Sequence, residues 1–232
     1  MGKTQALRIA LTHLTSLSGD ALVAAVLAPV CACCRRTLEA PLSGAVCARC
    51  WEDARAAAGR YEGTLRDIIH VFKYEGRRTL AEPLAALLRE RNAAALAGAA
   101  CIVPVPLFAW RRLRRGFNQA DALAGQLDLP VVQALWRIRP TASQTGLSAA
   151  ERRRNVRHAF RLSPLLSRRK RRSFVVDRVV VLLDDVMTTG ATSAACAGVL
   201  MEAGAREVRV VTLARAPLRS ERPTFTSASD AS

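Results

Sequence analysis

From residue 61 onward, apolar positions alternate between a helical period and short continuous runs. Leu65, Ile68, Ile69 and Phe72 are spaced i, i+3, i+4 and i+7, which places them on one face of a helix. The same reasoning assigns helices to three further segments, the last of which ends at a glycine. These predicted helices cover residues 80–96, 118–127 and 192–203.

Continuous apolar runs between these helices predict strands. Residues 179–183 are five consecutive apolar residues, the pattern of a strand that is buried on both faces. Shorter runs at 101–106, 130–136 and 208–213 predict further strands. Strands and helices that alternate in this way indicate an α/β fold, in which a parallel sheet is flanked by helices on both faces.

The chain ahead of this pattern divides into smaller parts. We expect a helical segment over residues 1–30, a cysteine-rich module over 31–58, the α/β domain over 60–216, and a disordered tail over 217–232. The apolar run near the start, at 21–30, is shorter than the roughly 20 residues of a membrane-spanning helix. No cleavage site typical of a secretory signal follows it, so a cytoplasmic protein without a membrane span is expected.

Composition fits a globular protein, and its charge is unevenly placed. Half of the 232 residues are hydrophobic, which excludes wholesale disorder. The net charge is +16, but an arginine bias can follow from genome composition, so the total alone says little. Residues 105–172 hold 16 basic residues against 3 acidic ones. An anionic partner, either a phosphate ligand or nucleic acid, is expected at this segment.

Five of the seven cysteines lie within residues 31–50. Cys31, Cys34, Cys47 and Cys50 form two C-x2-C pairs separated by twelve residues, a spacing that suits a zinc ion held by four thiolates. Four protein ligands leave no open position, so the predicted zinc is structural. Two alternatives stay open: four buried or redox-active cysteines, and Cys33 as a ligand in place of Cys31 or Cys34.

The most informative segment runs from Val180 to Thr192. The predicted buried strand ends in Asp184 and Asp185, and a loop over residues 188–192 then opens a helix. Such a loop offers backbone N–H groups and hydroxyls to a phosphate, whereas paired carboxylates need sugar hydroxyls or a cation. A ribose 5-phosphate with Mg²⁺ satisfies both requirements. The alternative is an ordinary strand–loop–helix with acidic residues at the cap, and the glycine patterns of Walker and dinucleotide loops are absent.

This segment resembles the phosphoribosyl-pyrophosphate signature of type I phosphoribosyltransferases at all thirteen positions. Over residues 25–216 the order of motifs is similar to the ComF family (also called GntX or ComFC). These are bacterial competence-associated proteins with a zinc knot ahead of a phosphoribosyltransferase domain. The motifs that follow the cysteine pairs are Phe72-Lys73-Tyr74-Glu75-Gly76, Val103-Pro104-Val105-Pro106-Leu107, Arg115-Gly116-Phe117-Asn118-Gln119, and Gln144 through Glu151-Arg152 to Asn155.

The resemblance implies a role for each part of the site. Asp184 and Asp185 would bind the ribose hydroxyls and form the catalytic pair. A flexible loop over residues 139–161 would close over the substrate and exclude water. From the residues alone, Lys73 could instead be a solvated lysine at a helix end. The 5′-phosphate is expected to bind at Met187, Thr188, Thr189, Gly190, Ala191 and Thr192. The pyrophosphate is expected to bind at Lys73 and at the segment Pro104, Val105 and Pro106, which runs towards Arg111, Arg112 and Arg115. The closing loop is expected to contribute Gln144, Arg152 and Asn155.

The function implied is binding of 5-phosphoribosyl 1-diphosphate with Mg²⁺, linked to competence, DNA uptake or DNA utilisation. As an enzyme, the protein would be a phosphoribosyltransferase whose acceptor the sequence does not specify. The alternative is a non-catalytic protein of this fold that senses the metabolite and engages single-stranded DNA or competence and recombination proteins. The basic run at residues 168–172 is then a surface for nucleic-acid phosphates.

Two departures from the family pattern concern local geometry. Arg35 stands where the family usually has glycine after the second cysteine, which predicts either strain in that turn or the use of Cys33 as a ligand. The segment over residues 163–178 is longer and more basic than the family pattern leads us to expect.

Overall fold

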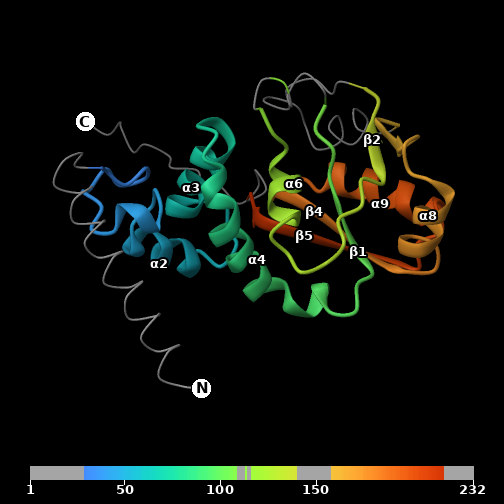
Figure 1. Ribbon diagram of the computed structural model, residues 1–232, viewed down its shortest axis with the longest axis horizontal. Helices are drawn as coiled ribbons and strands as arrows, with labels where there is room; N and C mark the ends of the chain where they lie inside the picture. The colour runs from blue at the N-terminus through green and yellow to red at the C-terminus, as the bar shows by residue number, and fades with distance from the viewer. Residues whose placement is uncertain (1–28, 109–112, 114–115, 140–157, 217–232) are drawn as a thin grey trace, which may run out of the picture.

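The computed structural model describes residues 29–108, 113, 116–139 and 158–216 (Figure 1). The predicted C-terminal tail and residues 1–28 of the predicted N-terminal helical segment lie outside these residues, and Val30 forms an antiparallel bridge with Thr37 rather than a helix. No helix in the described part of the chain combines the length and apolar character needed to cross a bilayer. The elements are, in order, η1 (Pro41–Ser43), α2 (Ala48–Ala56), α3 (Gly63–Tyr74), η2 (Arg78–Leu80), α4 (Ala81–Leu96), β1 (Cys101–Pro104), α6 (Gln119–Ala124), β2 (Leu135–Arg137), β3 (Phe160–Leu162), α8 (Arg168–Phe174), β4 (Val179–Met187), α9 (Ala191–Glu202) and β5 (Glu207–Arg215).

The central sheet is parallel. Its strand order is β1-β4-β5, so β4 is the middle strand and has hydrogen-bonded partners on both sides. On the outer side of β1, a parallel bridge joins Ile102 to Val131. Strands β2 and β3 form a separate antiparallel pair in which Trp136 lies opposite Arg161.

Alternate residues of β4 belong to two hydrophobic cores. Val181 and Leu183 pack with α3, α4 and α6, whereas Val180 and Leu182 pack with α9. Figure 1 shows α3 and α4 on one side of the sheet and α9 and α8 on the other. The structure therefore confirms the predicted α/β class, a parallel sheet with helices on both faces.

The cysteine-rich segment packs into the first of these cores. Cys31 and Cys50 are buried in the same hydrophobic cluster as Phe72 of α3. Arg91 of α4 donates to the backbone carbonyl of Ala54 near the end of α2 at 2.9 Å. The predicted module therefore shares its interior with the α/β part.

Several elements differ from the sequence prediction because their partners are distant in the chain. Strand β4 continues four residues beyond the predicted end at Leu183, since β5 supplies paired residues as far as Arg215. The run at 130–136 consists of the bridge at Val131 and strand β2, which extends to Arg137. The polar, arginine-rich residues 139–172 predict a long loop with one helix; their described part contains β3 as well as α8, because β3 is formed by pairing with β2.

Candidate functional site

Asp184 and Asp185 lie in the carboxyl-terminal half of β4. Each accepts a hydrogen bond from the next backbone N–H: Asp185 N lies 2.9 Å from Asp184 Oδ1, and Val186 N lies 2.6 Å from Asp185 Oδ1. The pair therefore lies near the carboxyl ends of the parallel strands, on the middle strand of the sheet, where open α/β folds bind ligands. This end of the sheet is called the β4 edge below.

Lys73 reaches this pair from the last turn of α3. Its Nζ lies 2.9 Å from Oδ2 of Asp185, and the two side chains are 11% and 15% exposed. The preceding Phe72 is fully buried, which anchors this turn of α3 against the core. A solvated helix-end lysine is therefore excluded, and Lys73 belongs to the acidic site.

The environment of Asp184 opposes its ionisation. The pKa of Asp184 is raised from 3.8 to about 7, because its carboxyl group is buried and Asp185 adds a like charge. The backbone N–H of Asp185 and the positive charges of Lys73 and Arg137 act in the opposite direction. Carboxyl groups whose pKa is shifted by burial and by nearby charges are typical of functional sites.

The loop after β4 makes a tight turn into α9. Gly190 has φ 72° and is the N-cap residue of α9, a left-handed conformation that favours glycine. A Cβ at this position would lie 3.6 Å from Sδ of Met187. Thr188 is exposed, and Thr189 and Thr192 are partly exposed. The first N–H groups of α9, together with these hydroxyls, therefore form a potential anion site beside the acidic pair.

The segment after β1 lies next to this edge. The Val105 N–H donates to the carbonyl of Leu183 at 2.9 Å, and Nδ2 of Asn118 donates to the carbonyl of Val105 at 3.2 Å. Pro104 and Val105 are buried, and Pro106 is partly exposed. The other predicted ligand-binding residues lie outside the described residues: Arg111, Arg112, Arg115, Gln144, Arg152 and Asn155.

Two residues of the site were not assigned from the sequence. Arg137 lies on β2, its guanidinium is 5.3 Å from the ring centroid of Phe160, and its charge lowers the pKa of Asp184. Nothing local to Arg137 indicates this position, which depends on the pairing of β2 with β3. Asn118 caps α6 as well as bonding Val105, and its place in the motif over residues 115–119 could have identified it.

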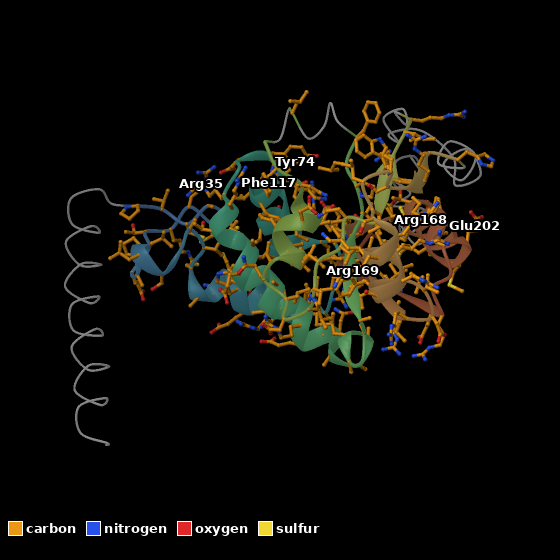
Figure 2. The ribbon with its side chains drawn as sticks, turned by 45° about the vertical axis from the view of Figure 1, so that its right-hand side comes forward. Arg35, Tyr74, Phe117, Arg168, Arg169 and Glu202 are labelled. Carbon is orange, nitrogen blue, oxygen red and sulfur yellow. The ribbon has the colours of Figure 1, made fainter. Side chains whose placement is uncertain are left out.

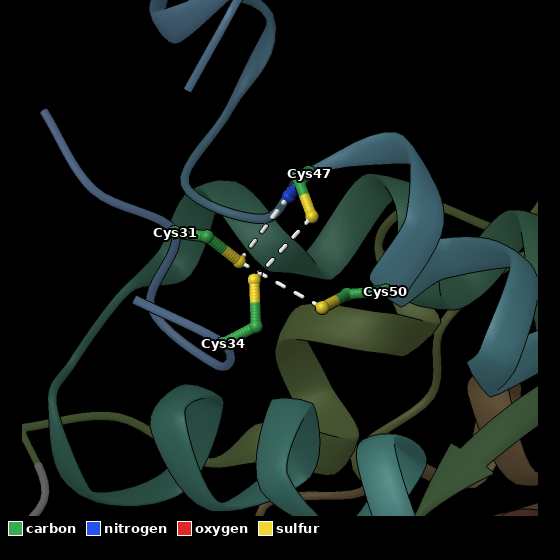
Figure 3. A group of neighbouring side chains, drawn as sticks. All are labelled: Cys31, Cys34, Cys47 and Cys50. Atoms are coloured by element: carbon green, nitrogen blue, oxygen red, sulfur yellow. Dashed lines mark hydrogen bonds between the residues drawn. The ribbon is translucent and has the colours of Figure 1, made fainter. Parts of the chain in front are cut away.

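Four cysteine sulfurs converge beside α2 (Figure 3). All lie within 4.8 Å of one another. The Sγ atoms of Cys31 and Cys50 are 3.9 Å apart, and those of Cys34 and Cys47 are 3.7 Å apart. A tetrahedron with zinc–sulfur bonds of about 2.3 Å has sulfur–sulfur separations of about 3.8 Å. The predicted four-cysteine set is therefore brought together in a geometry that could bind a metal such as zinc.

The remaining cysteine of this segment stands apart. Cys33 is not part of the four-sulfur cluster and packs against the hydrophobic core, and burial raises its pKa to about 12. The pKa of Cys31, by contrast, is lowered to about 6: burial raises it, but N–H donors including that of Cys47 outweigh this effect. The alternative in which Cys33 replaces Cys31 or Cys34 is not supported.

Arg35 adopts the conformation that glycine favours. Its φ is 62°, and its N–H donates to the carbonyl of Cys31 at 3.0 Å to close the first cysteine turn. A non-glycine residue in this region is strained. The strain expected where the family usually has glycine is confirmed, and the turn still delivers Cys34 to the cluster.

Comparison with known proteins identifies relatives over most of the chain. No family model matches it. It is 37% identical over 174 residues to competence protein F of Haemophilus influenzae, covering 71% of this chain and 73% of that protein. It is 36% identical over 194 residues to DNA utilization protein YhgH of Escherichia coli (strain K12), covering 77% and 81%.

Two solved structures are also similar in part. One is described as the allosteric regulatory enzyme of purine biosynthesis (24% identity, TM-score 0.37, 59% of this chain and 26% of that chain). The other is glutamine phosphoribosylpyrophosphate amidotransferase from B. subtilis complexed with ADP and GMP (25% identity, TM-score 0.37, 57% and 26%). The chain thus spans about a quarter of the length of each enzyme.

Fold and site together define an α/β protein with an acidic pair on its central strand and a four-cysteine cluster ahead of the sheet. The relatives then settle the family. The chain belongs to the ComF family, which includes competence protein F and DNA utilization protein YhgH.

Proposed function

We propose that the chain is a phosphoribosyltransferase-like protein that binds 5-phosphoribosyl 1-diphosphate with Mg²⁺ at the carboxyl edge of its sheet. The observation that carries this proposal is the short path from Asp185 through the Gly190 turn to the start of α9. Carboxylates suited to sugar hydroxyls and N–H groups suited to a phosphate are only a few residues apart. A ribose with a 5′-phosphate presents both groups at that separation.

Each part of the edge has a role in this proposal. Asp184 and Asp185 accept hydrogen bonds from the ribose hydroxyls. Residues 187–192 surround the 5′-phosphate, and each charge-assisted hydrogen bond there contributes about 1.5–3 kcal/mol. Backbone groups of residues 104–106 bind the diphosphate, whose charge Mg²⁺ reduces, and the sequence supplies further positive charge at the arginines that follow, which lie outside the described residues. In a transfer reaction, a nucleophile bonds to C1 as the bond from C1 to pyrophosphate breaks, and the acidic pair stabilises positive charge on the sugar.

We also propose that the cysteine cluster holds a structural Zn²⁺. The sulfur separations suit a tetrahedral ion, and all four positions are supplied by the protein. The ion would therefore stabilise the fold and would have no open position for a substrate.

The relatives are named for competence and for DNA utilization. By this family relationship we propose that the chain acts in the cytoplasm in DNA uptake or use. A second candidate function, binding of single-stranded DNA, is favoured by a groove of about 820 Å³ beside β2 and α8. Trp136 is 44% exposed and Leu165 is 81% exposed on its lining. The lining also includes Val131, Leu166, Lys170 and Phe174.

The helix at the rim of this groove is strongly basic. Residues 168–172 are all exposed, and Figure 2 shows Arg168 and Arg169 at the surface. None of these five residues forms an ion pair with a carboxylate in the described part of the chain. Trp136 and Lys170 line the same groove, and an exposed aromatic ring with a nearby cation is the combination that single-stranded nucleic acids recognise, through base stacking and phosphate contacts.

Calorimetric titration of 5-phosphoribosyl 1-diphosphate, with and without Mg²⁺, tests the first proposal on protein of verified zinc content. We expect binding only when Mg²⁺ is present. Asp184→Asn and Asp185→Asn should each weaken it at least about tenfold, or about 1.4 kcal/mol, because each removes a carboxyl oxygen that accepts from a ribose hydroxyl. Asp128→Asn is the matched control, since its side chain is 93% exposed and lies elsewhere. Unchanged affinity in both site variants would refute the assignment.

A further inference from the structure

Both carboxylate oxygens of Asp185 already have donors from within the protein. The Val186 N–H lies 2.6 Å from Oδ1, and Lys73 Nζ lies 2.9 Å from Oδ2. No other carboxylate among the described residues lies within ion-pairing distance of Lys73. The acidic pair therefore has a resident positive charge in contact with one of its members.

This arrangement does not fit a Mg²⁺ ion coordinated directly by Asp185. Mg²⁺ binds carboxylate oxygens at about 2.0–2.1 Å, so an ion on Oδ2 would lie against the ammonium of Lys73 and be repelled by it. Displacing Lys73 would leave a largely buried ammonium without its partner, which is unfavourable. The site thus has the cation that its carboxylates need, and that cation is a side chain.

The second carboxyl of the pair also has positive side chains nearby. Asp184 lies within the field of the positive charges of both Lys73 and Arg137. Two acidic and two basic side chains therefore oppose one another in this cluster. Residues from α3 and β2 thus offset part of the negative charge, although burial and Asp185 still raise the pKa of Asp184.

The residue type at this position is informative. Only three of the 35 basic residues are lysines, so the chain uses arginine almost everywhere else. A lysine carries a compact point charge on a flexible stem, whereas the planar guanidinium of arginine needs more room and more acceptors. At this 11% exposed position between α3 and β4, a compact ammonium contacts Asp185 without the further acceptors that a guanidinium would need.

We propose that Lys73 is a positioning residue that replaces a protein-bound divalent cation at the acidic pair. The protein alone then holds no divalent ion at Asp185, and Mg²⁺ arrives only as the complex with the diphosphate of the ligand. Arrival of Mg²⁺ with the diphosphate rests on the proposed function, whereas the absence of a divalent ion at Asp185 in the ligand-free protein does not.

Binding of Mn²⁺ alone, measured by the electron paramagnetic resonance signal of the free ion, tests this inference. The protein is the full zinc-loaded chain without nucleotide. In the wild type, Asp185→Asn should change Mn²⁺ affinity by less than twofold. Lys73→Met should raise Mn²⁺ affinity at least tenfold, and adding Asp185→Asn to Lys73→Met should abolish that gain. Arg89→Met is the matched control, because it removes the partner of an exposed aspartate and should produce no gain.

Two outcomes would overturn the inference: a wild-type Mn²⁺ site that Asp185→Asn weakens, or a folded Lys73→Met protein that shows no gain. Thermal melting identifies variants that do not fold, and the comparison of wild type with Asp185→Asn does not require the Lys73 variant. Failure of 5-phosphoribosyl 1-diphosphate to bind, with the Mn²⁺ results as expected, would remove the proposed function and leave the role of Lys73 intact. If the ligand binds but the wild type has a Mn²⁺ site at Asp185, the proposed function stands and the inferred role of Lys73 is refuted.

Discussion

At the scale of single residues, the acidic site lowers the stability of the unliganded protein. Asp184 is buried next to a like charge, and its pKa is raised to about 7 as a result. Burial of this kind persists where surrounding structure holds it in place and where a function uses it. The same carboxyl that would bind a ribose hydroxyl therefore destabilises the unliganded fold at neutral pH.

Replacing Asp184 should change how the free energy of unfolding depends on pH. In the unfolded chain the carboxyl ionises near 3.8, while in the folded chain it stays protonated up to about 7. The unfolded state therefore loses a proton first, and the free energy of unfolding falls as pH rises from about 4 to 7. Asp184→Asn should raise the free energy of unfolding at pH 8 by about 1 kcal/mol or more, with little gain at pH 4. Thermal melts at the two pH values measure the difference, and an equal gain at both would contradict this account.

Arg35 stores backbone strain in the first cysteine turn. Its φ of 62° is unfavourable for any residue with a Cβ. Arg35→Gly should therefore raise the free energy of unfolding by about 1 kcal/mol without changing metal content. Arg36→Gly is the matched control: it alters the neighbouring exposed arginine, which does not have a positive φ, and should be neutral or slightly destabilising. Chemical denaturation of the two variants distinguishes them, and an equal effect would rule out strain at Arg35.

At the scale of elements, the cysteine segment and α3 depend on each other. Cys31 and Cys50 are buried in the cluster that contains Phe72, one residue before Lys73. A metal at the four sulfurs would thus stabilise the helix that carries the resident cation of the acidic site. Through this shared interior, the proposed ion would help to hold Lys73 at the β4 edge.

Loss of the metal should consequently destabilise more of the protein than the two cysteine turns. Cys47→Ser with Cys50→Ser should remove bound zinc and lower the free energy of unfolding by more than about 3 kcal/mol, because metal binding is part of the folding energy. Cys33→Ser should keep one zinc per chain, since Cys33 is outside the cluster. Elemental analysis combined with thermal melting measures both effects. Full zinc content in the double variant would refute the four-cysteine site.

At the scale of the whole molecule, α2, beside the cysteine cluster, and α8, at the rim of the groove, lie at opposite ends (Figure 1). The four-cysteine segment packs beside α2 and α3, while the groove lies beside β2 and α8. The β4 edge is between these two regions. The groove lining includes Pro106, Asn118 and Arg137, which also belong to the β4 edge, so the proposed metabolite site and the proposed nucleic-acid surface adjoin each other.

Single-stranded DNA binding tests the groove. Changing Arg168, Arg169 and Lys170 together to Gln should weaken binding and lower the slope of log affinity against log salt by about one for each lost phosphate contact. Trp136→Ala should cost about 1–3 kcal/mol if a base stacks there. Exposed basic residues at the other end of the molecule, Arg49 and Arg66, serve as controls. Fluorescence anisotropy over a salt series measures the slope, and an unchanged slope would exclude α8 from DNA binding.

Local patterns in the sequence determined much of this protein. The apolar spacing in residues 64–72 predicted α3, and the run at 179–183 predicted the middle strand. The two C-x2-C pairs predicted the four-sulfur cluster, since each pair needs only one tight turn to bring its thiolates together. These features depend on neighbouring residues, so periodicity and spacing were sufficient.

Only the tertiary structure decided which side chains meet. The contact of Lys73 with Asp185 joins residues more than a hundred positions apart, and the approach of Arg137 depends on the pairing of β2 with β3. The extension of β4 to Met187 required β5 as a partner. No local pattern encodes such contacts, because they arise when separate hydrophobic faces are buried against one sheet. The sequence by itself therefore determined the elements and the metal-binding spacing, while packing decided that the cation beside the acidic pair is a lysine of the chain itself.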